Sequence, residues 1–259
     1  MPGRGIGCPI GDIEVVGEDR CPRGLACGVF RSLRVVAVKL LLTSGGVSNA
    51  SIRAALVGLL GKPIEESDAL LIPTAGYGHP MVTPQGVWRF ITGRSLTPMA
   101  ELGWRSLGVL ELSALPSIGV ERWLPWVGQA DALLANGGDA MYLTHWMRES
   151  GLADLLPTLD LVWAGISAGS LVMTPRVGED FVSAKPSITG DDRTLGVVDF
   201  AIFPHLDHPD LPENTMAHAE RWAAGIGVPA YAMDDETAIT VVDGEAEVIS
   251  EGHWRRFDA

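Results

Sequence analysis

Short apolar runs alternate with segments of helical spacing along most of the chain, from residue 35 onward. The runs predicted as strands are 35–42, 69–73, 107–112, 131–135, 160–164, 199–203 and 228–232. Helices are predicted between them: the first is capped by Ser48 or Asn49 and runs to about residue 60, and the others lie over 120–127, 140–150, 168–173 and 212–226. Residues 74–78 are predicted as a loop. Regular alternation of strand and helix is typical of βαβ units, in which the strands run parallel and helices cover the sheet. The pattern therefore predicts a three-layer α/β fold with a mostly parallel sheet flanked by helices.

The last part of the chain follows a different pattern. Residues 237–242, 245–249 and 253–257 alternate apolar and polar positions, and Asp243-Gly244 supplies a turn between the first two segments. We expect an antiparallel hairpin or meander at the C-terminal end of the sheet. Because no repeat or linker interrupts the pattern, a single domain over 35–259 is the economical prediction.

The segment 1–34 lacks such a pattern. It is rich in Gly, Pro and Arg, and it contains all three cysteines of the chain, Cys8, Cys21 and Cys27. An odd number of cysteines in one short segment does not make a disulfide framework, and their spacing is not that of a zinc site. We predict a poorly ordered N-terminal extension.

The turn after the run 160–164 carries the chain's clearest chemical motif. Gly165-Ile166-Ser167-Ala168-Gly169 fits Gly-x-Ser-x-Gly, the nucleophile elbow, which needs a strand before it and a helix after it. Both elements are predicted here, so Ser167 is the candidate nucleophile. The competing interpretation is a glycine-rich turn with an incidental serine, since the chain has 31 glycines.

A serine nucleophile needs a base, and chain position narrows the choice to two histidines. His205 comes directly after the run 199–203 and Pro204, and His208 lies three residues farther on. The carboxyl ends of strands are where sites of open α/β sheets assemble, so His205 is favoured as the base over His208. Two other interpretations stay open: solvated loop histidines, and a metal site made by His205, Asp207, His208 and Asp210.

The acid that orients the imidazole is expected in Asp234-Asp235-Glu236, which follows the run 228–232. Spacing alone does not choose among these three residues, and three adjacent carboxylates also suit a solvated turn. The order Ser, His, acid differs from the Ser, acid, His order of α/β-hydrolases.

The oxyanion hole is expected to use the backbone N–H of Ala168, the residue after the nucleophile. Its second donor is expected from Gly137-Gly138, where glycines allow close backbone approach, with Gly138 as the chosen donor. This chemistry calls for no metal and no organic cofactor.

The formal net charge of −13 narrows the class of partners. Nucleic acid and an anionic membrane surface are not expected as partners, because no basic stripe offsets the acidic excess. No apolar run approaches the roughly 18 residues of a membrane span, and we expect a cytoplasmic protein. A homodimer is one interpretation of the helix over 120–127, whose Trp123 and Trp126 serve either a subunit contact or the core.

Six segments carry a resemblance to a known family. They are Leu-Leu-Leu-Thr-Ser-Gly-Gly (40–46), Ala-Asn-Gly-Gly-Asp (135–139), Gly-Ile-Ser-Ala-Gly-Ser (165–170), Phe-Pro-His (203–205), Asp-Asp-Glu-Thr-Ala-Ile (234–239) and Ile-Ser-Glu-Gly-His-Trp (249–254). In this order they resemble the peptidase E (aspartyl dipeptidase) family of serine peptidases. That family includes cyanophycinase and shares its flavodoxin-like fold with class I glutamine amidotransferases, which carry Cys in the elbow where this chain has Ser167.

The resemblance implies that Ser167 is the nucleophile, His205 the base and Asp235 the acid of a peptidase acting on small peptides. The best-known members use Glu as the acid, and Glu179 or Asp180 is a further acidic position to consider. Peptidase E removes an N-terminal Asp from small peptides. The substrate-binding residues are not identified by the sequence; Arg176 is a candidate partner for a substrate carboxylate, against the alternative of an ordinary surface arginine. An isopeptidase or amidase of the cyanophycinase type and a non-catalytic ligand-binding protein on this fold are the alternatives.

Overall fold

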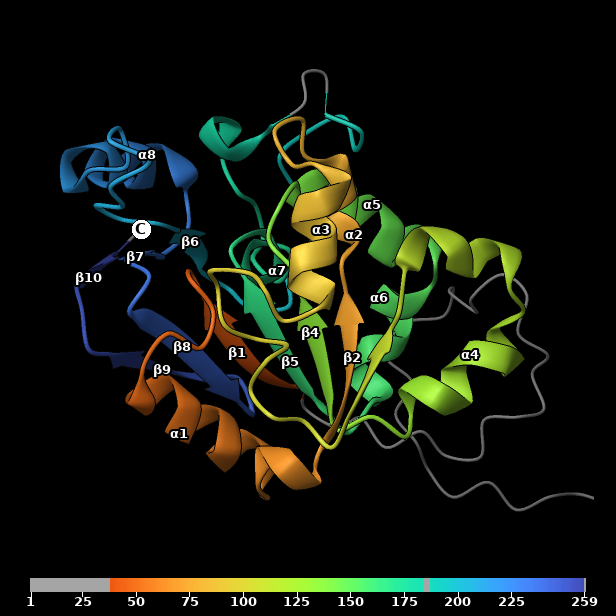
Figure 1. Ribbon diagram of the computed structural model, residues 1–259. Helices are drawn as coiled ribbons and strands as arrows, with labels where there is room; N and C mark the ends of the chain where they lie inside the picture. Colours follow the sequence, from red (N-terminus) through yellow and green to blue (C-terminus); the bar gives the residue numbers. More distant parts are fainter. Residues whose placement is uncertain (1–37, 184–186, 259) are drawn as a thin grey trace, which may run out of the picture. The chain divides into compact units, whose positions relative to one another are not determined.

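Seven strands form the central sheet of the computed structural model, which describes residues 38–183 and 187–258 (Figure 1). They are β1 (Lys39–Thr43), β2 (Asp68–Ile72), β3 (Ser106–Val109), β4 (Ala132–Ala135), β5 (Val162–Ile166), β8 (Thr237–Val242) and β9 (Glu245–Ser250). Their order is β3-β2-β4-β5-β1-β8-β9. The first five strands pair in parallel, and β8 and β9 pair antiparallel. The mostly parallel sheet with a C-terminal antiparallel hairpin is thus confirmed.

Helices cover both faces of this sheet, which confirms the three-layer prediction. They are α1 (Ala50–Leu60), α2 (Thr74–Gly78), α3 (Pro84–Ile91), α4 (Val120–Val127), α5 (Ala140–Glu149), α6 (Leu152–Leu155), α7 (Ala168–Leu171) and α8 (Met216–Ile226). Short 3-10 turns lie at Ile64–Glu66, Leu112–Ser117, Leu156–Thr158 and Glu179–Phe181. Side chains alternate along β1: Leu41 packs with α1, and Leu40 and Leu42 pack in the core that contains α4 and α5.

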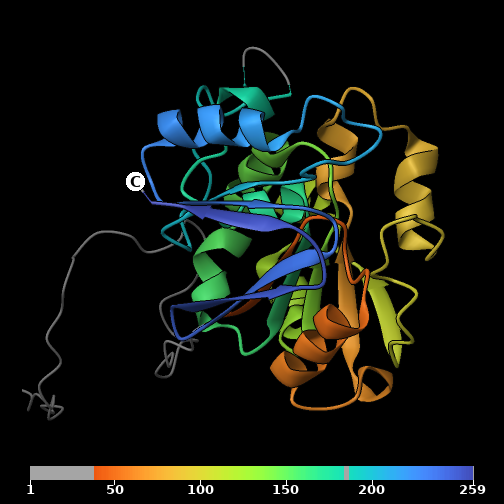
Figure 2. The same cartoon turned by 90° about the vertical axis from the view of Figure 1, so that its left-hand side faces the viewer.

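A second, three-stranded sheet is formed by β6 (Ala201–Phe203), β7 (Ala230–Met233) and β10 (Trp254–Phe257), in the order β10-β7-β6. Figure 2 shows α8 lying along this sheet, and Trp222 of α8 packs among Phe203 and Ala232. The segment 253–257 therefore does not continue the hairpin as a meander. A Cβ on Gly252 would lie 2.1 Å from the Asp234 carboxylate, so the glycine lets the chain pass close to that side chain before it pairs with β7.

Two further stretches differ from the sequence prediction. Residues 74–78, predicted as a loop, form α2. The glycines there allow close packing against neighbouring helices, because a Cβ on Gly78 would lie 2.3 Å from the Cβ of Tyr142 in α5. Helix α3 was not predicted; Thr83 caps it and Pro84 begins it. The N-cap of α1 is Asn49, one of the two predicted caps, whose side chain accepts a hydrogen bond from Ile52 N at 2.9 Å.

The tryptophans of α4 divide between core and surface. Trp123 is 4% exposed and Trp126 is 42% exposed, so one belongs to the core and the other stays available to a partner. No helix in the described part of the chain has the length and apolarity that crossing a bilayer requires. The extension predicted over 1–34 lies outside the described residues, and the single domain over 35–259 stays a prediction.

Candidate active site

Ser167 stands at a sharp turn between β5 and α7, as the elbow motif requires. Its backbone has φ 48° and ψ −111°, a conformation that costs a non-glycine residue about 1–3 kcal/mol. The turn is held by Ser167 N–H, which donates to the carbonyl of Thr43 in neighbouring β1 at 3.0 Å. Helix α7 ends at Leu171, two residues before the predicted end. The strain directs the serine side chain to the carboxyl edge of the sheet.

The two glycines of the motif are needed for packing at this turn. A Cβ on Gly165 would lie 2.3 Å from the carbonyl oxygen of Gly169, and a Cβ on Gly169 would lie 2.3 Å from that of Ala135. Both obstacles are backbone atoms of the central sheet or of the elbow itself. The helix therefore approaches the sheet only because these positions have no side chain.

Replacing Gly165 with alanine is expected to lower the free energy of unfolding by about 3 kcal/mol or more, because backbone on both sides must shift. Urea denaturation of the variant and the parent measures the difference. The matched control is Gly225→Ala in α8, where the added methyl meets no atom within 4 Å and stability should not fall. Equal stability of Gly165→Ala and the parent would contradict this account of the elbow.

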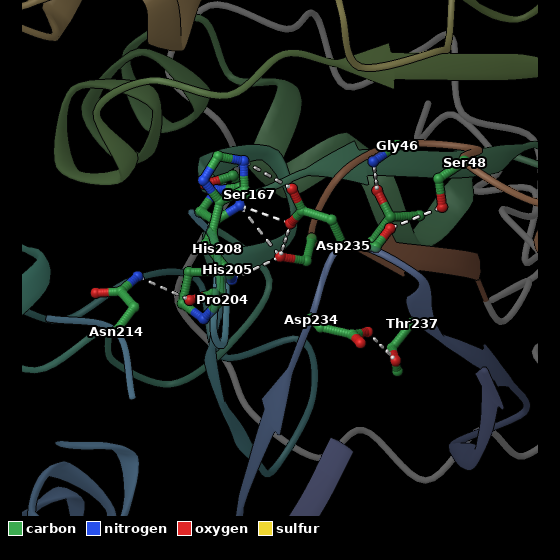
Figure 3. A network of polar contacts seen from close by, with 12 residues as sticks. Gly46, Ser48, Ser167, Pro204, His205, His208, Asn214, Asp234, Asp235 and Thr237 are labelled. Atoms are coloured by element: carbon green, nitrogen blue, oxygen red, sulfur yellow. Dashed lines mark hydrogen bonds and ion pairs between the residues drawn. The ribbon is translucent and has the colours of Figure 1, made fainter. Parts of the chain in front are cut away.

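The structure brings Ser167, His205 and Asp235 together in one chain of polar contacts (Figure 3). His205 Nε2 lies 2.9 Å from Ser167 Oγ, and His205 Nδ1 lies 2.7 Å from Asp235 Oδ1. Each residue directly follows, or lies within two residues of, the end of a strand: β5, β6 and β7. The geometry is that in which a carboxylate orients an imidazole toward a hydroxyl.

The neighbours of Asp235 have other partners. Asp234 accepts hydrogen bonds from Thr237 Oγ1 at 2.7 Å and from Glu236 N at 3.1 Å, so it closes the turn before β8. The Glu236 carboxylate accepts a bond from Asn49 Nδ2 at 3.0 Å on the surface. Of the three acidic candidates in this turn, only Asp235 contacts the imidazole of His205.

The other predicted alternatives do not take the place of His205 or Asp235 in this contact chain. Asp180 accepts from His218 Nε2 at 2.9 Å, and neither it nor Glu179 bonds to His205. His208 Nε2 lies 3.6 Å from Asp235 Oδ2, whereas His205 Nδ1 contacts the other oxygen, Oδ1, at 2.7 Å. Within the described ranges, no group of three or more His, Cys, Asp or Glu residues is placed to hold a metal, so the cluster of 205, 207, 208 and 210 does not form.

Ser44 is the residue that sequence reasoning missed. It is fully buried at the end of β1, its Oγ accepts from His205 N at 2.7 Å, and it donates to Asp235 Oδ1 at 2.8 Å. The sequence contained only an indirect indication, because Thr43-Ser44-Gly45-Gly46 ends a predicted strand. The next residue, Gly45, also lies against Asp235: a Cβ there would lie 2.6 Å from the Cβ of Asp235, so the glycine allows the two segments to approach.

Burial and charge together set the state of the Asp235 carboxyl. Burial works against ionisation and is the largest single influence on its pKa. The hydrogen bond and charge of His205, the hydroxyl of Ser44 and the charge of His208 act in the opposite direction, and the pKa lies below its ordinary value of 3.8. Asp235 is therefore a carboxylate at neutral pH.

Two backbone N–H groups predicted for an oxyanion hole lie at this site. Ala168 N–H opens α7 directly after Ser167, and the first N–H groups of a helix have no partner inside it. Gly137 N–H is taken up by Asn136 Oδ1 at 2.9 Å, whereas Gly138 N–H has no hydrogen-bond partner within 38–183 and 187–258. Gly138 has φ 140°, and a Cβ there would lie 2.2 Å from the carbonyl oxygen of Ala75, so only glycine fits.

A cavity of about 620 Å³ opens over Ser167 and His205 and is also lined by Gly138. Its described walls carry the carboxylates of Asp180 and Glu213 and no lysine or arginine. Arg176, the predicted candidate for binding a substrate carboxylate, does not line it. The Arg176 guanidinium instead makes two 2.9 Å bonds to the buried carboxylate of Asp192.

Two solved structures resemble this chain in fold. One is a candidate peptidase E protein from Listeria monocytogenes EGD-e, with a TM-score of 0.61 and 16% identity over 83% of this chain and 99% of the other. The second is a peptidase from an acI-B1 Actinobacterium, with a TM-score of 0.59 and 16% identity over 87% and 96%. No curated protein matches the chain significantly.

A match to a family model shows to which protein family the chain belongs. The model of peptidase family S51 matches residues 40–249, from the first strand of the central sheet to its last. This range includes the elbow, the histidine after β6 and the acidic turn before β8, which carried the resemblance to peptidase E. Since the match covers most of the chain, this protein belongs to peptidase family S51, and it is a serine peptidase of the peptidase E type.

Proposed function

We propose that Ser167, His205 and Asp235 form a catalytic triad that hydrolyses small peptides through an acyl-enzyme. The observation that supports this most directly is the contact chain from Ser167 Oγ to His205 Nε2 at 2.9 Å and from His205 Nδ1 to Asp235 Oδ1 at 2.7 Å. Because Asp235 is ionised, it can only accept at its short contact, so Nδ1 carries the proton. Nε2 then presents a lone pair to the serine hydroxyl.

In the proposed first step, Ser167 Oγ attacks the peptide carbonyl and its proton passes to His205 Nε2. The imidazolium then gives that proton to the leaving amine as the C–N bond breaks, which leaves an ester on Ser167. A water molecule attacks the ester, His205 takes its proton, and proton return to Ser167 releases the carboxylic acid. Asp235 offsets the positive charge on His205 in both halves of the reaction.

The negative charge that develops on the carbonyl oxygen is assigned to the N–H groups of Ala168 and Gly138. Each fixed donor of this kind contributes about 3–4 kcal/mol to the transition state in serine peptidases. Gly138, whose N–H has no hydrogen-bond partner among the described residues, lines the cavity together with Ser167, and Ala168 directly follows Ser167; both observations support this assignment. The proposed reaction uses no metal and no organic cofactor.

The size of the cavity supports small peptides as the substrate class. Its volume of about 620 Å³ is that of a site for a small ligand, which suits a dipeptide or tripeptide better than a folded protein. The test is release of free amine from a panel of short peptides by the purified protein. Failure to cleave any member of the panel would overturn the proposal and favour an isopeptide or side-chain amide as substrate.

Peptides that begin with a neutral or basic residue are expected to be cleaved about tenfold more efficiently than those that begin with Asp. The described cavity walls hold two carboxylates and no cationic side chain, so a substrate carboxylate meets like charge. Measuring kcat/KM for Asp-x, Ala-x and Lys-x peptides with the same second residue checks this. The double variant Asp180→Asn with Glu213→Gln should narrow the difference; a preference for Asp-x in the parent would contradict it.

A further inference from the structure

Ser44 joins two members of the proposed triad at the end of β1. Its side chain is fully buried, and its Oγ reaches both the main chain of His205 and the carboxylate of Asp235. We propose that Ser44 is a positioning residue, which holds Asp235 and His205 in the one arrangement that leaves His205 Nε2 free to accept a proton. This inference rests on the proposed triad and adds a fourth residue to it.

The hydrogen bonds of Ser44 can be assigned by counting protons. The backbone N–H of His205 is a donor, so at 2.7 Å the Ser44 oxygen must accept. Its single hydroxyl proton then has two possible acceptors, Asp235 Oδ1 at 2.8 Å and His205 Nδ1 at 3.4 Å. The carboxylate is nearer and charged, so the proton is donated to Asp235.

This assignment fixes the tautomer of the histidine. If the hydroxyl of Ser44 points to Asp235, His205 Nδ1 has no proton donor within reach, and it must itself donate to the carboxylate at 2.7 Å. The remaining ring nitrogen, Nε2, is then an acceptor and faces Ser167. Without Ser44, the carboxylate loses a donor and becomes free to rotate about its Cα–Cβ and Cβ–Cγ bonds toward His208, 3.6 Å from its second oxygen.

Ser44 also supports an unusual backbone conformation. His205 has φ 56°, which only glycine adopts readily, and its partly buried N–H would lose its one hydrogen-bond acceptor among the described residues if the Ser44 hydroxyl were removed. The same hydroxyl thus holds both the backbone of His205 and the carboxylate of Asp235. A nearby serine offers a contrast: Ser48 Oγ donates to the main-chain carbonyl of Asp235 at 2.7 Å and does not touch the carboxylate.

The test compares Ser44→Ala and Ser44→Cys with the control Ser48→Ala. Ser44→Ala should lower kcat by about 10- to 100-fold with little change in KM, as expected for loss of one hydrogen bond to a charged group. Ser44→Cys keeps the side chain's shape with a weak donor, and it should lose several-fold in kcat even if the alanine variant does not fold. Ser48→Ala should lose much less.

A second readout needs no substrate. In the parent, the His205 Nδ1 proton bonded to Asp235 should give a far-downfield proton NMR signal, identified by its absence from His205→Gln. The signal should shift or broaden in both Ser44 variants and persist in Ser48→Ala. An unchanged signal together with parental kcat in Ser44→Cys or Ser44→Ala would overturn the proposal for Ser44. A parent that cleaves no peptide would overturn the triad's function instead, and the signal would still decide the role of Ser44.

Discussion

Replacing Ser167 with alanine is expected to abolish peptide hydrolysis, lowering kcat by about 10⁵- to 10⁶-fold. The variant lacks the oxygen that forms the acyl-enzyme, and no other described hydroxyl contacts His205 Nε2. Its fold should persist, because the Ser167 side chain makes a hydrogen bond only to that imidazole, and alanine fits the same backbone conformation equally well. Amine release from the best peptide, measured beside the unfolding midpoint, checks both statements.

A matched control for this variant is Ser183→Ala. Ser183 lines the same cavity, but its hydroxyl makes no hydrogen bond to the contact chain of Ser167, His205 and Asp235. Its activity should stay within a few-fold of the parent. If Ser167→Ala kept more than about one hundredth of parental activity, contamination having been excluded, Ser167 would not be the nucleophile.

The inner strands β1, β2, β4 and β5 could be predicted because burial on both faces leaves short, continuous apolar runs. Ser167 directly follows β5 of the central sheet, and His205 lies two residues after β6 of the second sheet, so strand ends predicted from apolar runs locate both residues. A residue that follows a predicted strand is expected at the carboxyl end of that strand. The sequence pattern could therefore place these two residues without knowledge of any contact between them.

Asp235 and Ser44 could not be located in this way. Asp234, Asp235 and Glu236 lie in one turn, where each side chain points in its own direction, and only the tertiary contacts assign them to Thr237, His205 and Asn49. Ser44 has no pattern of its own. It meets Asp235 because β8 pairs antiparallel with β1, with Thr43 opposite Ala238.

Helix α2 was missed for a related reason. Its sequence, Thr74–Gly78, contains two glycines, which favour a loop by intrinsic propensity. In the fold both are close-packed: Gly76 against Val87 and Gly78 against Tyr142. Tertiary contacts with neighbouring helices therefore override the local preference, and such contacts are not visible in a single sequence.

Replacing Asp235 with asparagine is expected to lower kcat by about 10³- to 10⁴-fold at neutral pH, the second-largest effect. Asparagine is neutral, so the imidazolium of His205 loses its counter-charge, and an amide N–H facing Nδ1 favours the wrong tautomer. Asp235→Glu, which keeps the charge on a longer side chain, should retain more activity than Asp235→Asn. The kcat of the three proteins on one peptide checks this order, and equal loss in both variants would contradict a role for the charge.

The lowered pKa of Asp235 also predicts that the free energy of unfolding depends on pH. The folded pKa of Asp235 lies below 3.8, so the unfolded chain binds the proton more readily in this range. The stabilisation by the charged carboxylate is therefore complete above about pH 4–5 and is lost as pH falls through the folded pKa. Urea denaturation of the parent and Asp235→Asn should give a larger difference in unfolding free energy at pH 5 than below 3.8, where the difference shrinks. Protonation removes the charge of Asp235 but leaves its shape. If the difference in unfolding free energy between the two proteins did not change with pH, Asp235 would therefore stabilise the fold through its shape and hydrogen bonds and not through its charge.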